Sequence, residues 1–252
     1  DKDGVLVDVI LRDERSFVRS DNRVVIMAGG MGKRLMPLTT DCPKPMVKVH
    51  GKPILERIVD NFKENGFFKF TFCINYLGDV IENYFGDGSK WNISINYVRE
   101  DKPLGTAGAL GYLDHIPKHS FFVVNGDVLT NLNFLNLLNF HREQTADATM
   151  CVSNYVVEIP YGVVDVNGYE IEQLIEKPTH SWFVNAGIYC LSPNVLQYIN
   201  KDEYLDMPTL FDRLKQNKRK SVYFPIQDSW FDVGQLHDLK KAENHIRKIN
   251  ER

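Results

Sequence analysis

Residues 23–45 of the chain read "RVVIMAGGMGKRLMPLTTDCPKP", a short apolar run followed by a loop rich in glycine, cations and proline. The apolar run has the composition of a buried β-strand, whereas the loop is a poor former of both helix and strand. In open α/β sheets, ligands bind at the carboxyl ends of strands. Because ordering such a loop costs conformational entropy, we expect that a bound ligand offsets this cost.

The loop carries groups that suit a phosphate ligand. Gly29, Gly30 and Gly32 allow backbone N–H groups to approach an anion closely. Arg34 offers a forked set of donors that matches phosphate oxygens, and Lys44 adds a point charge between two prolines. Taken alone, the same residues also fit a surface turn with solvated cations.

Two common phosphate-binding loops do not fit this stretch. A P-loop would need glycine where Met27 stands and serine or threonine where Arg34 stands. A dinucleotide-binding loop that begins at Gly30 would need glycine where Leu35 stands. If the loop binds phosphate, it therefore does so as a different class of site, and the surface turn stays open.

The composition limits the partners that the protein can have. The 252 residues include 43% hydrophobic and 25% charged residues, and the net charge of −3 provides no general basic field. We therefore expect no nucleic-acid partner. No apolar run approaches the roughly 20 residues that span a bilayer, so we expect no membrane association. Four scattered cysteines without CxxC spacing indicate reduced thiols in a cytoplasmic protein.

The hydrophobic pattern alternates between strand and helix as far as residue 148. One predicted helix carries Ile54, Ile58 and Phe62 at helical spacing. Such alternation favours a Rossmann-like α/β fold, with a mostly parallel sheet and helices on both faces. Antiparallel strands follow, with a hairpin turn at Asn167-Gly168, so we expect a mixed sheet with an added antiparallel subregion.

The order G-G-x-G-x-R-x-x-P-x-T-x-x-x-P-K-P in residues 29–45 resembles the signature of the sugar-1-phosphate nucleotidyltransferases. Lys33 stands where that family usually has threonine. Further segments follow in the family's order, namely LGTAGAL (104–110), VVNGD (123–127), YGVV (161–164), IEKP (175–178), VNAGIY (184–189) and WFDVG (230–234). The resemblance covers roughly residues 23–245 and implies a GT-A-like nucleotidyltransferase fold whose antiparallel part binds the sugar.

The resemblance implies attack by the phosphate of a sugar 1-phosphate on the α-phosphorus of a nucleoside triphosphate, with release of pyrophosphate. A phosphate monoester is largely dianionic near neutral pH because its second pKa is about 6, so the reaction needs no general base. The obstacle is repulsion between two anions. Catalysis then consists of positioning and charge neutralisation by cations and Mg²⁺.

Two carboxylates are the candidate metal ligands. Asp127 ends a buried apolar strand, where an unpaired carboxylate would be costly, and Asp232 lies in the aromatic segment WFDVG. Mg²⁺ prefers carboxylate, water and phosphate oxygens. The resemblance implies that Asp127 and Asp232 hold the catalytic Mg²⁺ together. The alternative is that each aspartate caps a turn.

The resemblance also distributes the remaining roles. Lys177 would meet the phosphate of the sugar, while Arg34 and Lys44 would serve the triphosphate; the resulting catalytic residues are Arg34, Lys44, Asp127, Lys177 and Asp232. The nucleotide-binding residues would be Ala28, Gly29, Gly30, Gly32, Lys33, Gly105 and Thr106. The sugar-phosphate-binding residues would be Gly162, Glu176, Lys177 and Asn185. A side chain at Gly105 is expected to block stacking of the base.

We expect an enzyme that makes a nucleotide sugar, with GTP as the favoured triphosphate. The segments at 39–55 and 103–110 look most similar to the mannose-1-phosphate guanylyltransferase branch, although uridylyl and thymidylyl relatives share much of this pattern. A glycosyltransferase would usually carry Asp-x-Asp where Asp127-Val128-Leu129 stands. Two alternative functions stay open, namely a non-catalytic sensor of nucleotide sugars and an enzyme acting on phosphocholine. Assembly into a homo-oligomer also stays open.

The chain divides into two parts in this interpretation. Residues 1–20 form an N-terminal extension in which the segment at 3–17 resembles the last strand and helix of a CBS domain, a module that binds adenosine nucleotides. Residues 21–252 form the nucleotidyltransferase domain. The sugar is expected to be a mannose-, heptose- or glucosamine-type 1-phosphate that feeds synthesis of surface glycans.

Overall fold

The computed structural model describes residues 19–250, with side chains as far as residue 248. The extension at residues 1–20, with its likeness to a CBS domain, therefore lies almost wholly outside the described residues. Within the described part of the chain, no helix is long and apolar enough to cross a membrane.

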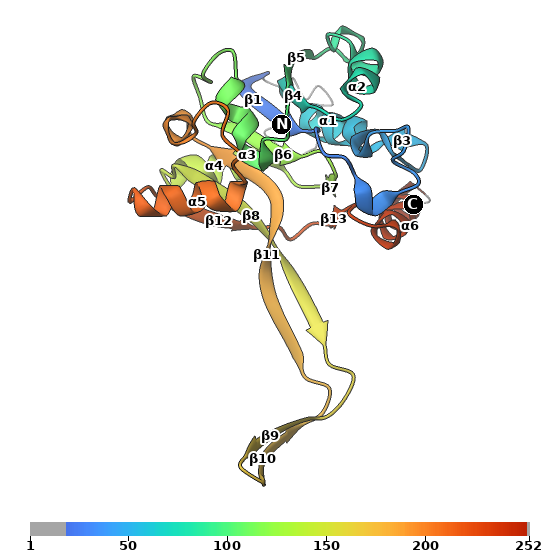
Figure 1. Ribbon diagram of the computed structural model, residues 1–252, viewed down its shortest axis with the longest axis vertical. Coiled ribbons are helices and arrows are strands. Elements are labelled where there is room, and N and C mark those ends of the chain that lie inside the picture. The colour runs from blue at the N-terminus through green and yellow to red at the C-terminus, as the bar shows by residue number, and fades with distance from the viewer. Residues whose placement is uncertain (1–18, 251–252) are drawn as a thin grey trace, which may run out of the picture.

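The body of the protein is built on a mixed seven-stranded sheet in the order β12-β8-β11-β6-β1-β4-β5 (Figure 1). Strand β11 is antiparallel to both of its neighbours, β6 and β8, and the other four pairs of this sheet are parallel. The strands of this sheet are β1 (Ser20–Met27), β4 (Phe67–Ile74), β5 (Ser94–Arg99), β6 (Phe121–Asn125), β8 (Ala148–Glu158), β11 (Thr179–Leu191) and β12 (Ser221–Pro225). The predicted mixed, mostly parallel sheet is confirmed.

Helices cover both faces of this sheet. They are α1 (Ile54–Glu64), α2 (Gly78–Phe85), α3 (Gly105–Gly108), α4 (Phe134–Glu143), α5 (Met207–Gln216) and α6 (Leu236–Asn250), with short 3₁₀ turns η1 (Lys33–Leu35), η2 (Lys44–Met46), η3 (Ser89–Trp91), η4 (Ala109–Tyr112) and η5 (Pro193–Tyr198). Side chains alternate along a strand, so Val24 and Ile26 enter the core under α1 and α4 while Val25 enters the core under α5. The predicted amphipathic helix is confirmed as α1.

Three small two-stranded sheets complete the fold. They pair β2 (Lys48–Val49) with β3 (Lys52–Pro53), β7 (Val128–Thr130) with β13 (Trp230–Asp232), and β9 (Val163–Asn167) with β10 (Glu170–Ile175). The last pair confirms the hairpin predicted at Asn167-Gly168, although its turn is made by Gly168 and Tyr169.

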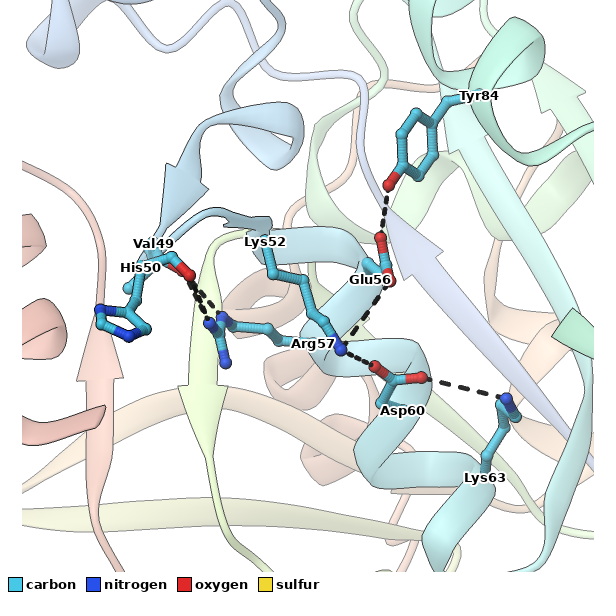
Figure 2. A network of polar contacts seen from close by, with 8 residues as sticks. All are labelled: Val49, His50, Lys52, Glu56, Arg57, Asp60, Lys63 and Tyr84. Atoms are coloured by element: carbon cyan, nitrogen blue, oxygen red, sulfur yellow. Dashed lines mark hydrogen bonds and ion pairs between the residues drawn. The ribbon is translucent and has the colours of Figure 1, made fainter. Parts of the chain in front are cut away.

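The β2–β3 hairpin that follows the glycine-rich loop is fixed to α1 (Figure 2). Arg57 donates hydrogen bonds to Val49 O from Nε at 3.1 Å and from Nη2 at 2.7 Å. Lys52 Nζ pairs with Asp60 Oδ2 at 2.8 Å. These contacts hold the end of the glycine-rich loop on a packed helix, so that Lys44 has a rigid base.

The antiparallel subregion extends away from the body. Beyond Val152 and Asn185, β8 and β11 leave the central sheet and continue as a two-stranded ribbon that ends in the β9–β10 hairpin (Figure 1). We call residues 154–184 the arm. Because β8 and β11 each belong to both the sheet and the arm, the arm has the direction that the sheet gives it.

Candidate active site

The glycine-rich loop follows β1 and folds back on itself. Gly32 has a φ of +62°, and a Cβ there would lie 2.9 Å from Lys44 Cβ, so only glycine fits against the lysine stem. Thr39 Oγ1 donates a hydrogen bond to Gly32 O at 2.9 Å and closes the fold of the loop. A Cβ on Gly30 would meet nothing within 4 Å, which leaves open space where the backbone can face a ligand.

A cavity of about 320 Å³ lies at the carboxyl ends of β1 and β6, bounded on one side by this loop. The predicted residues in its lining are Gly29, Gly30, Lys44, Gly105, Thr106 and Asp127. Ala28 is fully buried just behind the loop. A larger cavity of about 460 Å³ lies between α1 and α6 and is lined by none of the predicted residues. The sequence therefore brings its phosphate candidates to the smaller cavity.

The two acidic segments meet through the pairing of β7 with β13. Asp232 lies opposite Val128 in this ladder, and Val233 N donates a hydrogen bond to Asp127 O at 3.0 Å. Lys44, which is 8% exposed, forms an ion pair from Nζ to Asp127 Oδ2. Residues from two distant segments, predicted to act together, are thus side by side.

The pKa of Asp232 depends on its burial and on the charges around it. Its side chain reaches solvent, yet the surrounding protein removes enough water to raise its pKa, and the negative charge of Asp127 raises that pKa further. The charges of Lys44 and Arg34 act in the opposite direction. Arg34 lies against the backbone that follows, since a Cβ on Gly234 would be 3.5 Å from both of its Nη atoms.

The two carboxylates suit a hard divalent cation. Repulsion between Asp127 and Asp232 is what such a cation would relieve, and oxygen ligands are what it prefers. Among residues 19–248, no group of three or more acidic, histidine or cysteine side chains could hold a metal by itself. A cation here would therefore complete its shell with water or phosphate oxygens.

We expect Asp232→Asn to stabilise the protein at pH 7 when neither metal nor nucleotide is present. Because its folded-state pKa is raised, the stability associated with the protonated carboxyl is present at acidic pH and lost as pH rises through that pKa. The gain in Tm should be small, about 1–3 °C, because solvent screens this exposed carboxylate. Thermal melts should show the gain at pH 7 and lose it below the ordinary aspartate pKa.

Asp228→Asn, which removes an exposed carboxylate four residues earlier, is the control and should leave Tm unchanged. A lower Tm for Asp232→Asn at pH 7 would show that Asp232 is held by favourable contacts rather than repelled.

None of the predicted sugar-binding residues lines this cavity, and three of them, Gly162, Glu176 and Lys177, belong to the arm. Glu176 and Lys177 are exposed on the arm, and a Cβ on Gly162 would lie 3.0 Å from Glu176 Oε2. Asn185 lies at the base of the arm, where its Oδ1 accepts a hydrogen bond from Gly187 N at 3.0 Å. Lys177 lies between β10 and β11 on the arm and does not line the cavity that contains Asp127. Its contact with the sugar phosphate stays a prediction.

Thr106 and Gly105 have structural contacts that the sequence did not indicate. Thr106 Oγ1 accepts a hydrogen bond from Met207 N at 2.8 Å, which ties α3 to α5. A Cβ on Gly105 would lie 2.6 Å from Leu205 O. The backbone at 205, rather than a stacked base, is thus the first obstacle to a side chain at Gly105.

Several polar residues of the cavity were not among the predicted site residues, and three of them come from segments outside the predicted motifs. Glu100, Tyr204 and Asp206 all line the space opposite the glycine-rich loop. Burial raises the pKa of Glu100, and a hydrogen bond from Leu104 N at 3.0 Å opposes that rise. Glu100 directly follows β5, so its place at a strand end was the available signal. No local signal marks Tyr204 and Asp206, which reach the cavity from the start of α5.

The strand ends of this α/β sheet carry a buried lysine, a glycine-rich backbone and two neighbouring acids, which together suit nucleotide phosphates. The fold and the site thus define a nucleotide-binding α/β protein. Residues 23–249 match the family described as "Nucleotidyl transferase". The chain belongs to this family.

Curated relatives agree with this family. The chain is 36% identical over 228 residues to "Probable mannose-1-phosphate guanylyltransferase 2" of Oryza sativa subsp. japonica, covering 86% of this chain and 62% of the relative. It is 31% identical over 241 residues to the "UTP--glucose-1-phosphate uridylyltransferase" of Synechocystis sp., covering 87% and 62%. The chain thus spans about 62% of the length of these relatives.

Solved structures agree with the fold. A putative glucose-1-phosphate thymidylyltransferase from Bacillus anthracis superposes with a TM-score of 0.72 at 24% identity, covering 89% of this chain and 95% of that chain. HddC from Yersinia pseudotuberculosis, complexed with GMP-PN, superposes with a TM-score of 0.68 at 25% identity, covering 89% and 99%.

Proposed function

We propose that the protein is an enzyme that joins a sugar 1-phosphate to a nucleoside triphosphate, giving a nucleotide sugar and pyrophosphate. The observation that carries this proposal is the meeting of Lys44 and Arg34 with the paired acids Asp127 and Asp232 beside the glycine-rich loop. Membership of the nucleotidyl transferase family and the names of the curated relatives support it.

The chain's own groups would lower the repulsion between the two substrates. Backbone N–H groups of the glycine-rich loop would hold the triphosphate, and Lys44 and Arg34 would neutralise its charge. The sugar phosphate oxygen forms a new bond to the α-phosphorus as the bond to pyrophosphate breaks in line. A divalent cation, Mg²⁺ in our proposal, would be held by Asp127 and Asp232 and would supply charge neutralisation at the reacting phosphates.

We propose GTP as the triphosphate because of Glu100. The guanine edge presents two adjacent donors, N1–H and N2–H, which a carboxylate can accept together, whereas uracil presents one donor between two carbonyls. Glu100 Oε2 accepts the Leu104 N–H, and a Cβ on Gly29 would lie 3.1 Å from Oε1, so this oxygen faces the loop. The GMP-PN in the HddC complex and the guanylyltransferase names agree with this preference.

We expect Glu100→Gln to reduce the preference for GTP over UTP by about 10- to 100-fold, since a mismatched polar contact costs about 1–3 kcal/mol. The glutamine amide adds a donor that opposes the guanine donors and removes one acceptor. The ratio of kcat/KM for the two triphosphates measures the effect. Glu143→Gln, which changes an exposed residue at the end of α4, is the control. An unchanged ratio would remove Glu100 from base recognition.

Pyrophosphate release, measured for each pair of a triphosphate with a sugar 1-phosphate or phosphocholine, tests the proposed function. Turnover with one sugar 1-phosphate is expected, of mannose, heptose or glucosamine type. Binding of a nucleotide sugar without any turnover would instead indicate a regulatory subunit, and turnover with phosphocholine alone would indicate a different acceptor. We place the reaction in the cytoplasm, as a step that feeds surface glycan synthesis.

A further inference from the structure

The arm exposes an unusual amount of apolar surface. Among the residues that the structure describes, 22 large hydrophobic side chains are exposed, and 12 of them lie on the arm. These are Tyr155, Val156, Val157, Tyr161, Val164, Val166, Tyr169, Ile171, Leu174, Ile175, Trp182 and Phe183. Concentrated exposure of this kind marks an interaction surface.

Several of these apolar side chains are neighbours across the strands. Tyr155 lies opposite Trp182, and both are 55% exposed. Two residues along the ribbon, His180 stacks on Trp182 with ring centroids 5.9 Å apart. In the hairpin, Val164 pairs with Leu174 and Val166 with Ile171, on one face.

Both faces of the ribbon carry exposed apolar side chains, because Tyr155 and Val156, like Trp182 and Phe183, are neighbours that point to opposite faces. A two-stranded ribbon without cover is at best marginally stable in water.

The body of the same chain does not supply this cover. The ladder between β8 and β11 is regular from Asn185 and Val152 to Thr179 and Glu158, and its one register irregularity lies between Asn185 and Tyr189, at the base of the arm. The exposed side chains of the arm are left uncovered by the described part of the chain. With about 150–250 Å² for each aromatic side chain, the arm exposes on the order of 1,000 Å² of apolar surface. A standard interface needs about 800 Å² from each partner.

A second copy of this chain complements the arm in both charge and apolar surface. The arm carries five carboxylates and one lysine. The exposed part of the glycine-rich loop carries the opposite charge, because the exposed Lys33 stands among exposed apolar residues. These are Met31, Met36 and Leu38, at 44%, 50% and 46% exposure. We call residues 31–38 the loop rim. Because each chain carries both an arm and a loop rim, a twofold dimer can pair each arm with the partner's loop rim.

We propose that two copies exchange arms, so that the arm of each covers the loop rim of its partner and brings Lys177 to the partner's Asp127 and Asp232. The active site would then be incomplete in a single chain and complete in the dimer. The role given to Lys177 rests on the proposed function, whereas the dimer itself does not.

Complementation between two inactive variants tests the exchange. Asp127→Asn keeps a normal arm and Lys177→Ala keeps normal acids; each alone is expected to lose at least about 100-fold in kcat/KM. Heterodimers isolated with two affinity tags should regain about half of the wild-type activity, because one of the two sites then has both groups. No recovery, a fully active Lys177→Ala parent or no heterodimer would each overturn the proposal.

Sedimentation equilibrium tests the dimer independently of turnover. The wild-type chain is expected to sediment at twice its 29.1 kDa. Trp182→Ser should shift this equilibrium to monomer without unfolding, since its ring is 55% exposed, whereas Ile116→Ser, at a position 69% exposed in the body, should not. A monomeric wild type, or a dimer insensitive to Trp182→Ser, would overturn the exchange. A dimer that lacks turnover with every substrate pair would count against the proposed function alone.

Discussion

Asp127→Asn is expected to lower turnover by at least about 10³-fold while leaving the fold intact. The substitution removes one negative charge from the pair that would hold the divalent cation, and an amide oxygen is a weaker ligand. Lys44 is buried and pairs with Asp127, so loss of that partner would ordinarily be costly. The asparagine oxygen still accepts a hydrogen bond from Lys44 Nζ, which limits the loss of stability to about 1–2 kcal/mol.

Pyrophosphate release and thermal melting separate the two effects. Asp212→Asn, which changes an exposed carboxylate on α5, is the matched control and should alter neither. A variant that stays folded and retains turnover within about tenfold of wild type would remove Asp127 from the proposed metal site. A variant that unfolds would show that the Lys44–Asp127 pair is mainly structural.

The sheet and the glycine-rich loop could be predicted because their signals are local. The run Val24–Met27 has to bury both faces, and the alternation of strands and helices leaves few topologies for the next 120 residues. The pairing of β7 with β13 is not local, yet Asp127 and Asp232 could be associated through the family resemblance. The association of the two aspartates thus came from the family resemblance and not from the hydrophobic periodicity.

The cavity wall at 203–206 and the direction of the arm could not be predicted. Thr106 N donates a hydrogen bond to Asp206 Oδ1 at 3.0 Å, although the two residues are 100 positions apart in the sequence. No sequence motif at either position predicts this contact. The strands of the arm were predicted as an antiparallel subregion, but their direction depends on the register of β8 against β11 inside the central sheet. Long-range register decides where Lys177 lies, and a single sequence does not state it.

Gly105→Ala is expected to cause the larger loss of stability in a matched pair with Gly51→Ala. Gly105 and Gly51 have nearly equal φ values of +79° and +80°, so both alanines have the same backbone strain of about 1–2 kcal/mol. A Cβ on Gly51 would meet nothing within 4 Å, whereas a Cβ on Gly105 would lie 2.6 Å from Leu205 O. The steric conflict is therefore the main expected difference between the two variants.

That conflict has a defined consequence at the cavity. Leu205 O accepts hydrogen bonds from Ala107 N at 2.9 Å and Gly108 N at 3.0 Å, so displacing it loosens α3. We expect Gly105→Ala to destabilise the protein by about 1–3 kcal/mol more than Gly51→Ala, and to weaken nucleotide binding as the wall shifts. Urea unfolding of both variants and calorimetric titration with GTP measure the two effects. Equal destabilisation would mean that the backbone at 205 yields freely and that only the φ strain at Gly105 matters.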